Sequence, residues 1–138
     1  MSLGTATCAY DYAIIRVMPR VEREEFINVG VIVSCPAHRF LESRIELDES
    51  RLLALAPDSD PETVHAHLRS IVLICEGGKA AGVIGQFTPR ERFYWLTARR
   101  STIIQTSPVH VGRCTDPNTL IEHLMETMVR SPRQEQAP

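Results

Sequence analysis

The sequence predicts an α+β fold: an antiparallel meander of three strands plus a returning strand, packed against three to four helices. Two observations support this prediction. Three β-rich segments come first in the chain, and helical patterns follow them, with one further extended segment before the last helix. Strands and helices grouped in this way are typical of α+β domains, whereas doubly wound parallel sheets alternate them.

The three β-rich segments are residues 10–19, 27–36 and 38–47. The first is rich in Tyr, Ile and Val and is stopped by a proline. The second is almost continuously apolar, which predicts a central strand covered on both faces. The third alternates apolar and polar residues, and the short Pro-Ala link before it favours an antiparallel pair.

Four helix starts carry capping residues, three of them with proline at the first helical position; the caps are Asp48, Asp60, Thr88 and Asp116. Thr88 and Glu91 form the pattern of a capping box. Residues 101–112 are extended, with one strand up to Thr106 and a second piece after Pro108. Because 101–106 contains a β-branched run, we expect it to join the first three strands.

The chain length of 138 residues predicts one domain at residues 10–130, between a flexible N-terminus (1–9) and a disordered tail (131–138). The formal net charge of −2 gives no support for nucleic-acid binding. No apolar run approaches the roughly 20 residues that span a bilayer, and no secretory signal is present. Four widely spaced cysteines fit a reducing cytoplasm. The sequence does not determine the oligomeric state.

Several chemistries have no motif in this chain. There is no glycine-rich phosphate loop, so we expect no nucleotide cofactor. His65 and His67 are two residues apart on a helix and face different directions, so we predict no metal site there. Cys114 precedes the last helix, whose dipole could lower the pKa of its thiol, but position alone rarely makes a cysteine reactive.

The charged turn between the first two strands is the first candidate site. If it curls into a helical turn, Glu22 and Glu25 fall on one face, where two carboxylates could hold a divalent cation or share a proton. Arg20 and Arg23 are interleaved with them. A solvated turn that neutralises its own charge explains the same pattern more simply.

Arg16 lies within the first strand and needs a partner, because an unpaired buried charge is costly. Glu22 or Glu25, across the hairpin, is the structural candidate. The functional alternative is a carboxylate or phosphate of a ligand, which an arginine binds through two parallel hydrogen bonds.

The second candidate site is the segment 90–112, in which arginines alternate with aromatic residues. Such a pattern can bind single-stranded nucleic acid by charge and stacking. A core face formed by Phe93, Trp95 and Leu96, with arginines capping the helix end, is the simpler interpretation. His110 follows on a loop, where a titratable side chain is more often functional than in a core.

Two long strings, "YAIIRVMPRVEREEFINVGVIVSCP" (12–36) and "RFYWLTARRSTIIQTSPVHVG" (92–112), resemble a bacterial family of domains of unknown function, number 3037. The resemblance runs from about residue 12 to residue 129. It implies a partner role, through kinase-like proteins of the HipA type, and brings no established activity. The chain carries the family's pattern at Arg16, Pro19, Arg20, Glu22, Arg23, Glu25, Asn28, Gly30, Trp95, Arg99 or Arg100, Ser101, Ser107, Pro108 and His110.

The leading hypothesis is therefore a binding or partner module whose polar surface is formed by residues 19–28 and 99–110. Its ligand, an anion or an acidic protein partner, would be bound by Arg16, Arg20, Arg23, Asn28, Arg99 and Ser101. The alternative is an enzyme acting on phosphate esters or nucleic acid, with Glu22 and Glu25 as metal ligands or base and His110 moving protons. A third interpretation is that ion pairs merely fix the hairpin register.

Overall fold

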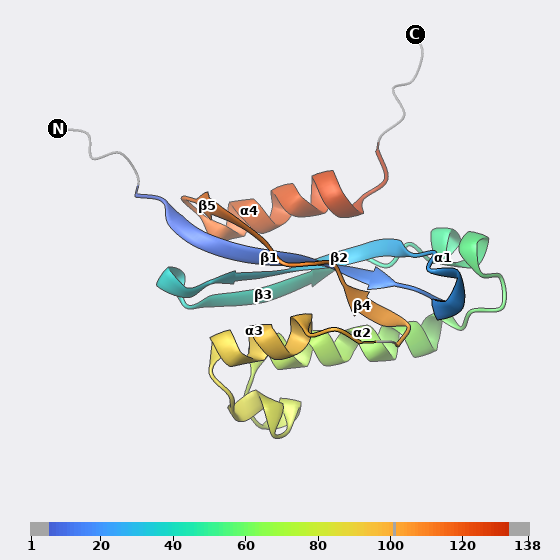
Figure 1. The fold of residues 1–138 in the computed structure, drawn as a ribbon, viewed down its shortest axis with the longest axis horizontal. Helices are drawn as coiled ribbons and strands as arrows, with labels where there is room; N and C mark the ends of the chain where they lie inside the picture. The colour runs from blue at the N-terminus through green and yellow to red at the C-terminus, as the bar shows by residue number, and fades with distance from the viewer. Residues whose placement is uncertain (1–5, 101, 133–138) are drawn as a thin grey trace, which may run out of the picture.

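A computed structural model describes residues 6–100 and 102–132, which form a five-stranded antiparallel sheet with helices on both faces (Figure 1). The strands are β1 (Cys8–Val17), β2 (Ile27–Cys35), β3 (Phe40–Ile45), β4 (Ile104–Thr106) and β5 (His110–Cys114). Their order is β3-β2-β1-β4, and β5 also pairs with β1. The predicted α+β class and the returning strand are confirmed.

The returning segment pairs with β1 in two pieces. β4 lies beside the last three residues of β1, and β5 lies beside its first five. Ser107, between them, is buried, and its Oγ accepts a hydrogen bond from the amide of Ile14 at 2.8 Å. One edge of β1 is thus covered by two short strands placed end to end.

The helices divide between the two faces of the sheet. Figure 1 shows α2 (Pro61–Glu76) and α3 (Pro89–Thr97) below the sheet, and α4 (Pro117–Leu124) above it. The short α1 (Glu49–Leu55) lies at one end, and α4 continues as a π-helical turn, η5 (Met125–Val129). Short 3₁₀ turns connect the larger elements: η1 (Val21–Arg23), η2 (Pro36–His38), η3 (Lys79–Ala81) and η4 (Ile84–Gln86). All four predicted caps accept a backbone hydrogen bond, and both halves of the capping box are present.

Two apolar clusters form the core, one on each face of the sheet. The larger joins β1 and β2 to α2 and α3, with Ile15, Phe93 and Leu68 at its centre. The smaller joins Val31 and Val33 to α4 and η5. Since β2 contributes to both clusters, its continuously apolar sequence is explained by burial on two faces.

The predicted core face of α3 is partly wrong. Phe93 and Leu96 are buried, but Trp95 is 39% exposed. Side chains two positions apart on a helix point about 200° away from each other, so Phe93 and Trp95 cannot share a face. Arg92 is buried instead, and its guanidinium donates to the carbonyls of Ile74 and Cys75 near the end of α2. These are the orphan acceptors that every helix C-terminus leaves.

The boundaries differ in detail from the prediction. β3 spans six residues, fewer than the predicted 38–47, and β4 begins only at Ile104. β1 begins at Cys8, and the predicted tail lies outside the described residues from position 133 on. Among the described residues, no helix has the length and apolar character needed to cross a membrane.

Candidate functional site

Three polar side chains lie side by side on the sheet near the charged turn; we call Asn28, Arg16 and Gln105 the Arg16 row. Arg16 on β1 is the direct partner of Asn28 on β2 and of Gln105 on β4. Its neighbours Ile15 and Val17 belong to the cluster between the sheet and helices α2 and α3. Because successive side chains of a strand alternate between faces, the row points to the α4 side.

A β-bulge sets this register. Ile15 pairs with Gly30 and Arg16 with Asn28, so Val29 has no partner on β1. Such a bulge re-aims the side chains that follow it. Asn28 consequently points towards the end of η5, where its Nδ2 donates to the carbonyl of Met128 at 3.0 Å.

Arg16 is half-buried and has no carboxylate partner among the described residues. Its guanidinium lies over the ring of Phe26, 4.2 Å from the centroid. Its Nε is buried without a hydrogen-bond partner, as is the Oδ1 of Asn28. A buried polar atom left unpaired costs about 1–3 kcal/mol. Neither Glu22 nor Glu25 supplies the partner that the sequence suggested.

Both arginines of the charged turn are paired, one of them within the turn and the other with a residue outside it. Arg23 pairs with Glu25, and Arg20 pairs with Asp58 at 3.3 Å. These side chains are about half exposed or more, so such pairs contribute little to stability. The helical turn covers only Val21–Arg23 and is ended by left-handed backbone at Glu24. Glu22 and Glu25 therefore do not share a helical face.

The second segment reaches the row only through β4. Met18 donates its amide to the carbonyl of Ile103 at 2.7 Å, and the Nε2 of Gln105 donates to the carbonyl of Thr102 at 2.9 Å. His110 pairs with Tyr12 and stacks on its ring, 5.2 Å between centroids. This places it five residues before the end of β1, roughly 17 Å along the strand.

Arg99, the other predicted residue of that segment that the structure describes, is not brought to the row. Arg99 is exposed and follows α3, which packs on the other face of the sheet. Ser101 lies outside the described residues. Among the described residues, no group of three or more His, Cys, Asp or Glu side chains could hold a metal ion. The geometry thus separates His110 from Glu22 and Glu25.

A second arginine on the same side of the sheet has the opposite environment. Arg130 pairs with Glu46 at 2.7 Å, with Glu122 at 2.5 Å and with Glu126 at 3.1 Å; we call these four residues the Arg130 clasp. These hydrogen bonds raise the pKa of Arg130 and lower that of Glu122. The clasp ties the last helix to the end of β3.

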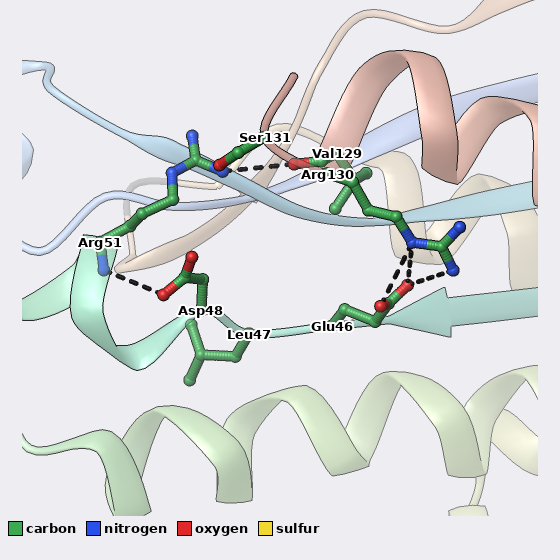
Figure 2. A pocket seen from close by; sticks show the side chains of 7 residues that line it. All are labelled: Glu46, Leu47, Asp48, Arg51, Val129, Arg130 and Ser131. Carbon is green, nitrogen blue, oxygen red and sulfur yellow. Dashed lines mark hydrogen bonds and ion pairs between the residues drawn. The ribbon is translucent and has the colours of Figure 1, made fainter. Parts of the chain in front are cut away.

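Figure 2 shows the cleft beside the clasp, with a volume of about 260 Å³. Arg51 donates to the carbonyl of Val129 at 3.2 Å, and Asp48 accepts from the amide of Arg51. Arg130 reaches Glu46 on the other side of the cleft. The charged side chains that line the cleft pair with one another or with backbone groups. Both of its arginines therefore have partners within the protein, and these contacts stabilise the fold.

Gly30 and Cys114 have structural explanations. A Cβ at position 30 would lie 2.4 Å from the carbonyl oxygen of Arg44, so the close approach comes from the neighbouring strand. Burial is the main cause that raises the pKa of Cys114, with the nearby Cys35 and Cys8 adding to it. This direction is opposite to the lowering of the thiol pKa that a helix dipole would cause.

Gln105 and Phe26 belong to the site but were not predicted from the sequence. Gln105 interrupts a run of β-branched residues between Ile104 and Thr106, and this interruption could have been recognised in the sequence. Phe26 directly precedes an apolar strand and looks like its first core residue. Its position over Arg16 depends on how the turn folds back.

Comparison with known proteins supports the resemblance noted in the sequence. The model of a family described as a protein of unknown function (DUF3037) matches residues 12–129. The matched region contains the whole Arg16 row and the clasp residues except Arg130. No curated protein and no solved structure matches the chain.

Proposed function

This chain belongs to the DUF3037 family of proteins of unknown function, and we propose that it is a binding module whose Arg16 row receives an acidic side chain of a protein partner. The observation that carries the proposal is the guanidinium of Arg16, which is held over Phe26 but has no carboxylate partner among the described residues. A carboxylate that binds this guanidinium would supply the ion-pair partner that Arg16 does not have within the described residues.

The surroundings of Arg16 fit a protein partner better than a free ion. Phe26 is 40% exposed and Met128 is 38% exposed, and both lie beside the row. Arginine, aromatic residues and methionine are enriched in the buried centres of protein interfaces. Stacking on Phe26 also fixes the plane of the guanidinium, so less freedom is lost when it binds a carboxylate.

The partner to test first is a kinase-like protein of the HipA type, because the family resemblance points to it. We place the interaction in the cytoplasm, since all four cysteines are free thiols. An enzyme that uses Glu22, Glu25 and His110 receives no support from geometry, because these side chains lie at different ends of β1. Ion pairs that fix the hairpin register do not explain Arg16 either.

The test is an NMR titration of the ¹⁵N-labelled protein with a blocked peptide of alternating glutamate and leucine. The Nε–H signal of Arg16 should shift and saturate. Arg16→Gln should weaken binding roughly tenfold or more, because a charge-assisted hydrogen bond is worth about 1.5–3 kcal/mol. Arg69→Gln, an exposed change on α2 across the sheet, should leave the affinity unaltered.

Inorganic phosphate is titrated in parallel. An equal affinity for phosphate and for the peptide would replace the protein partner by a free anion. Binding of the peptide that persists in Arg16→Gln would overturn the proposed site. If a HipA-type kinase is the partner, the complex purified from co-expressing cells should be lost in Arg16→Gln and kept in Arg69→Gln.

A further inference from the structure

A groove whose arginine has no carboxylate partner among the described residues lies on the opposite face of the molecule from the Arg16 row. It has a volume of about 540 Å³ and lies between α2, the end of α3 and the segment that leads to β4. Its wall is mainly apolar, with Ile71 and Ile74 from α2, Leu96 from α3, and Ile104. We call it the Trp95 groove, because the only tryptophan of the chain lines it.

The polar groups of this groove carry positive charge or none. Arg100 and His67 are the titratable residues of the lining, and no Asp or Glu is among its described residues. Ser70 and Thr102 add hydroxyl groups. An apolar wall with a few polar groups, in a volume of some hundreds of Å³, is the composition typical of small-ligand sites.

Arg100 is held in place without a counterion. Its guanidinium stacks on Trp95, 4.1 Å from the ring centroid, and donates to the carbonyls of Trp95 and Leu96. These bonds cap the end of α3 and use two of its five N–H donors. Burial lowers the pKa of Arg100 from its usual value, and no carboxylate among the described residues compensates for this.

Helix capping alone does not account for the groove. A capping arginine needs only the carbonyls at the helix end, and an exposed position would serve equally well. Here the cation is stacked on a tryptophan that is 39% exposed, and both residues line a mainly apolar groove. Trp and Arg are the residues that most often dominate the energy of a binding surface.

We propose that the Trp95 groove binds a small carboxylic acid with an apolar body. The hydrocarbon part lies against Ile71, Ile74 and Leu96, where it is removed from water. The carboxylate lies at Arg100, whose remaining N–H donors it accepts from. The positive lining without a carboxylate favours an anionic ligand over a neutral or cationic one of the same shape.

The test follows the fluorescence of Trp95, the only tryptophan, during titration of the full chain with octanoate and, separately, with octanol. Both probes have the same apolar body, so the ratio of their affinities isolates the contribution of the charge. Octanoate should change the emission saturably and bind roughly tenfold more tightly than octanol. Butyrate, with a shorter body, should bind more weakly than octanoate.

Arg100→Gln should bring the ratio of the two affinities close to one, whereas Arg99→Gln, which removes the same charge from the adjacent exposed residue, should keep it. Because the ratio is measured within one variant, local fraying of α3 does not mimic this result. Ser70→Phe, which fills the groove from the exposed side of α2, should abolish binding of both probes.

Equal affinities for octanoate and octanol in the unmodified protein would overturn the assignment of an acid. The absence of any saturable change in Trp95 emission with either probe would overturn the site. Arg16→Gln should leave octanoate binding unchanged, so failure of this inference and failure of the proposed function are separate outcomes.

Discussion

Arg130 and Arg16 lie on the same side of the sheet, on either side of the end of the last helix, and their environments are opposite. Arg130 makes ion pairs with three glutamates, and Arg16 makes none among the described residues. Their ion pairs distinguish two kinds of surface arginine. An arginine whose donors are occupied by its own chain stabilises the fold, whereas one that is oriented but unpaired is the one for which we propose a partner.

Asn28 stands between the two regions, because it lies next to Arg16 on the neighbouring strand and its amide holds the carbonyl of Met128. The same side chain thus completes the helix end and forms part of the candidate site. Its Oδ1, buried and without a partner, belongs to the unpaired region.

The largest effect that we predict comes from giving Arg16 the partner it lacks. Asn28→Asp places a carboxylate opposite Arg16, and this internal pair should reduce the affinity for the acidic peptide roughly tenfold or more. Asn28→Ser also removes the amide but adds no charge, so it should keep most of the affinity. The peptide titration described above measures both, and Asn28→Asp binding as tightly as the unmodified chain would contradict the site.

Breaking the clasp should affect stability and not binding. Arg130→Met leaves Glu46 and Glu126 without a cation and leaves Glu122 with Arg44 as its remaining partner, so we expect the melting temperature to fall by a few degrees at low salt and by less at high salt. Arg69→Met, an exposed change on α2, is the matched control. A loss of peptide binding in Arg130→Met would show that the two regions are coupled.

The same variant has a defined pH dependence. Arg130 and Arg44 lower the pKa of Glu122 below its ordinary value of 4.5. Its contribution to stability is therefore complete above pH 4.5 and is lost as the pH falls through the lower pKa of the folded state. The stability difference between Arg130→Met and the unmodified chain should shrink in acid below that value, in urea unfolding measured at a series of pH values.

The smallest effect is expected for the stability of Arg16→Met. The change removes a buried donor without a partner and also removes the contact with Phe26, worth about 0.5–1 kcal/mol at an exposed site. The two contributions oppose each other, so the free energy of unfolding should stay within about 0.5 kcal/mol or rise slightly. A loss of more than about 2 kcal/mol would reveal a structural partner for this arginine.

Local signals made the elements of this fold predictable. Asp48, Asp60, Thr88 and Asp116 cap helices through backbone groups within three residues of each cap, so short windows of sequence contain the whole interaction. The apolar run of β2 likewise predicted its central place, since a strand buried on both faces has no polar face to show.

The candidate site was predictable only in part. Arg16 was recognised because an arginine inside an apolar strand is an exception to the pattern, and Asn28 was recognised through the family resemblance. Gln105 and Phe26 were missed, because their neighbours in space are set by a returning strand and by a folded turn. The burial of Arg92 and the exposure of Trp95 were not predicted, because the carbonyls at the end of α2 hold Arg92 in the core and lie far from it in sequence.

Short-range patterns in the sequence were enough to predict where four helices begin, that β2 is a central strand, and which polar residues are unusual. Which arginine is paired and which has no ion pair among the described residues depends on the tertiary structure. Arg130 meets Glu46 across 84 positions, and Asn28 meets Met128 across 100. Contacts at such separations depend on how the sheet and the last helix pack together, and no local pattern records them.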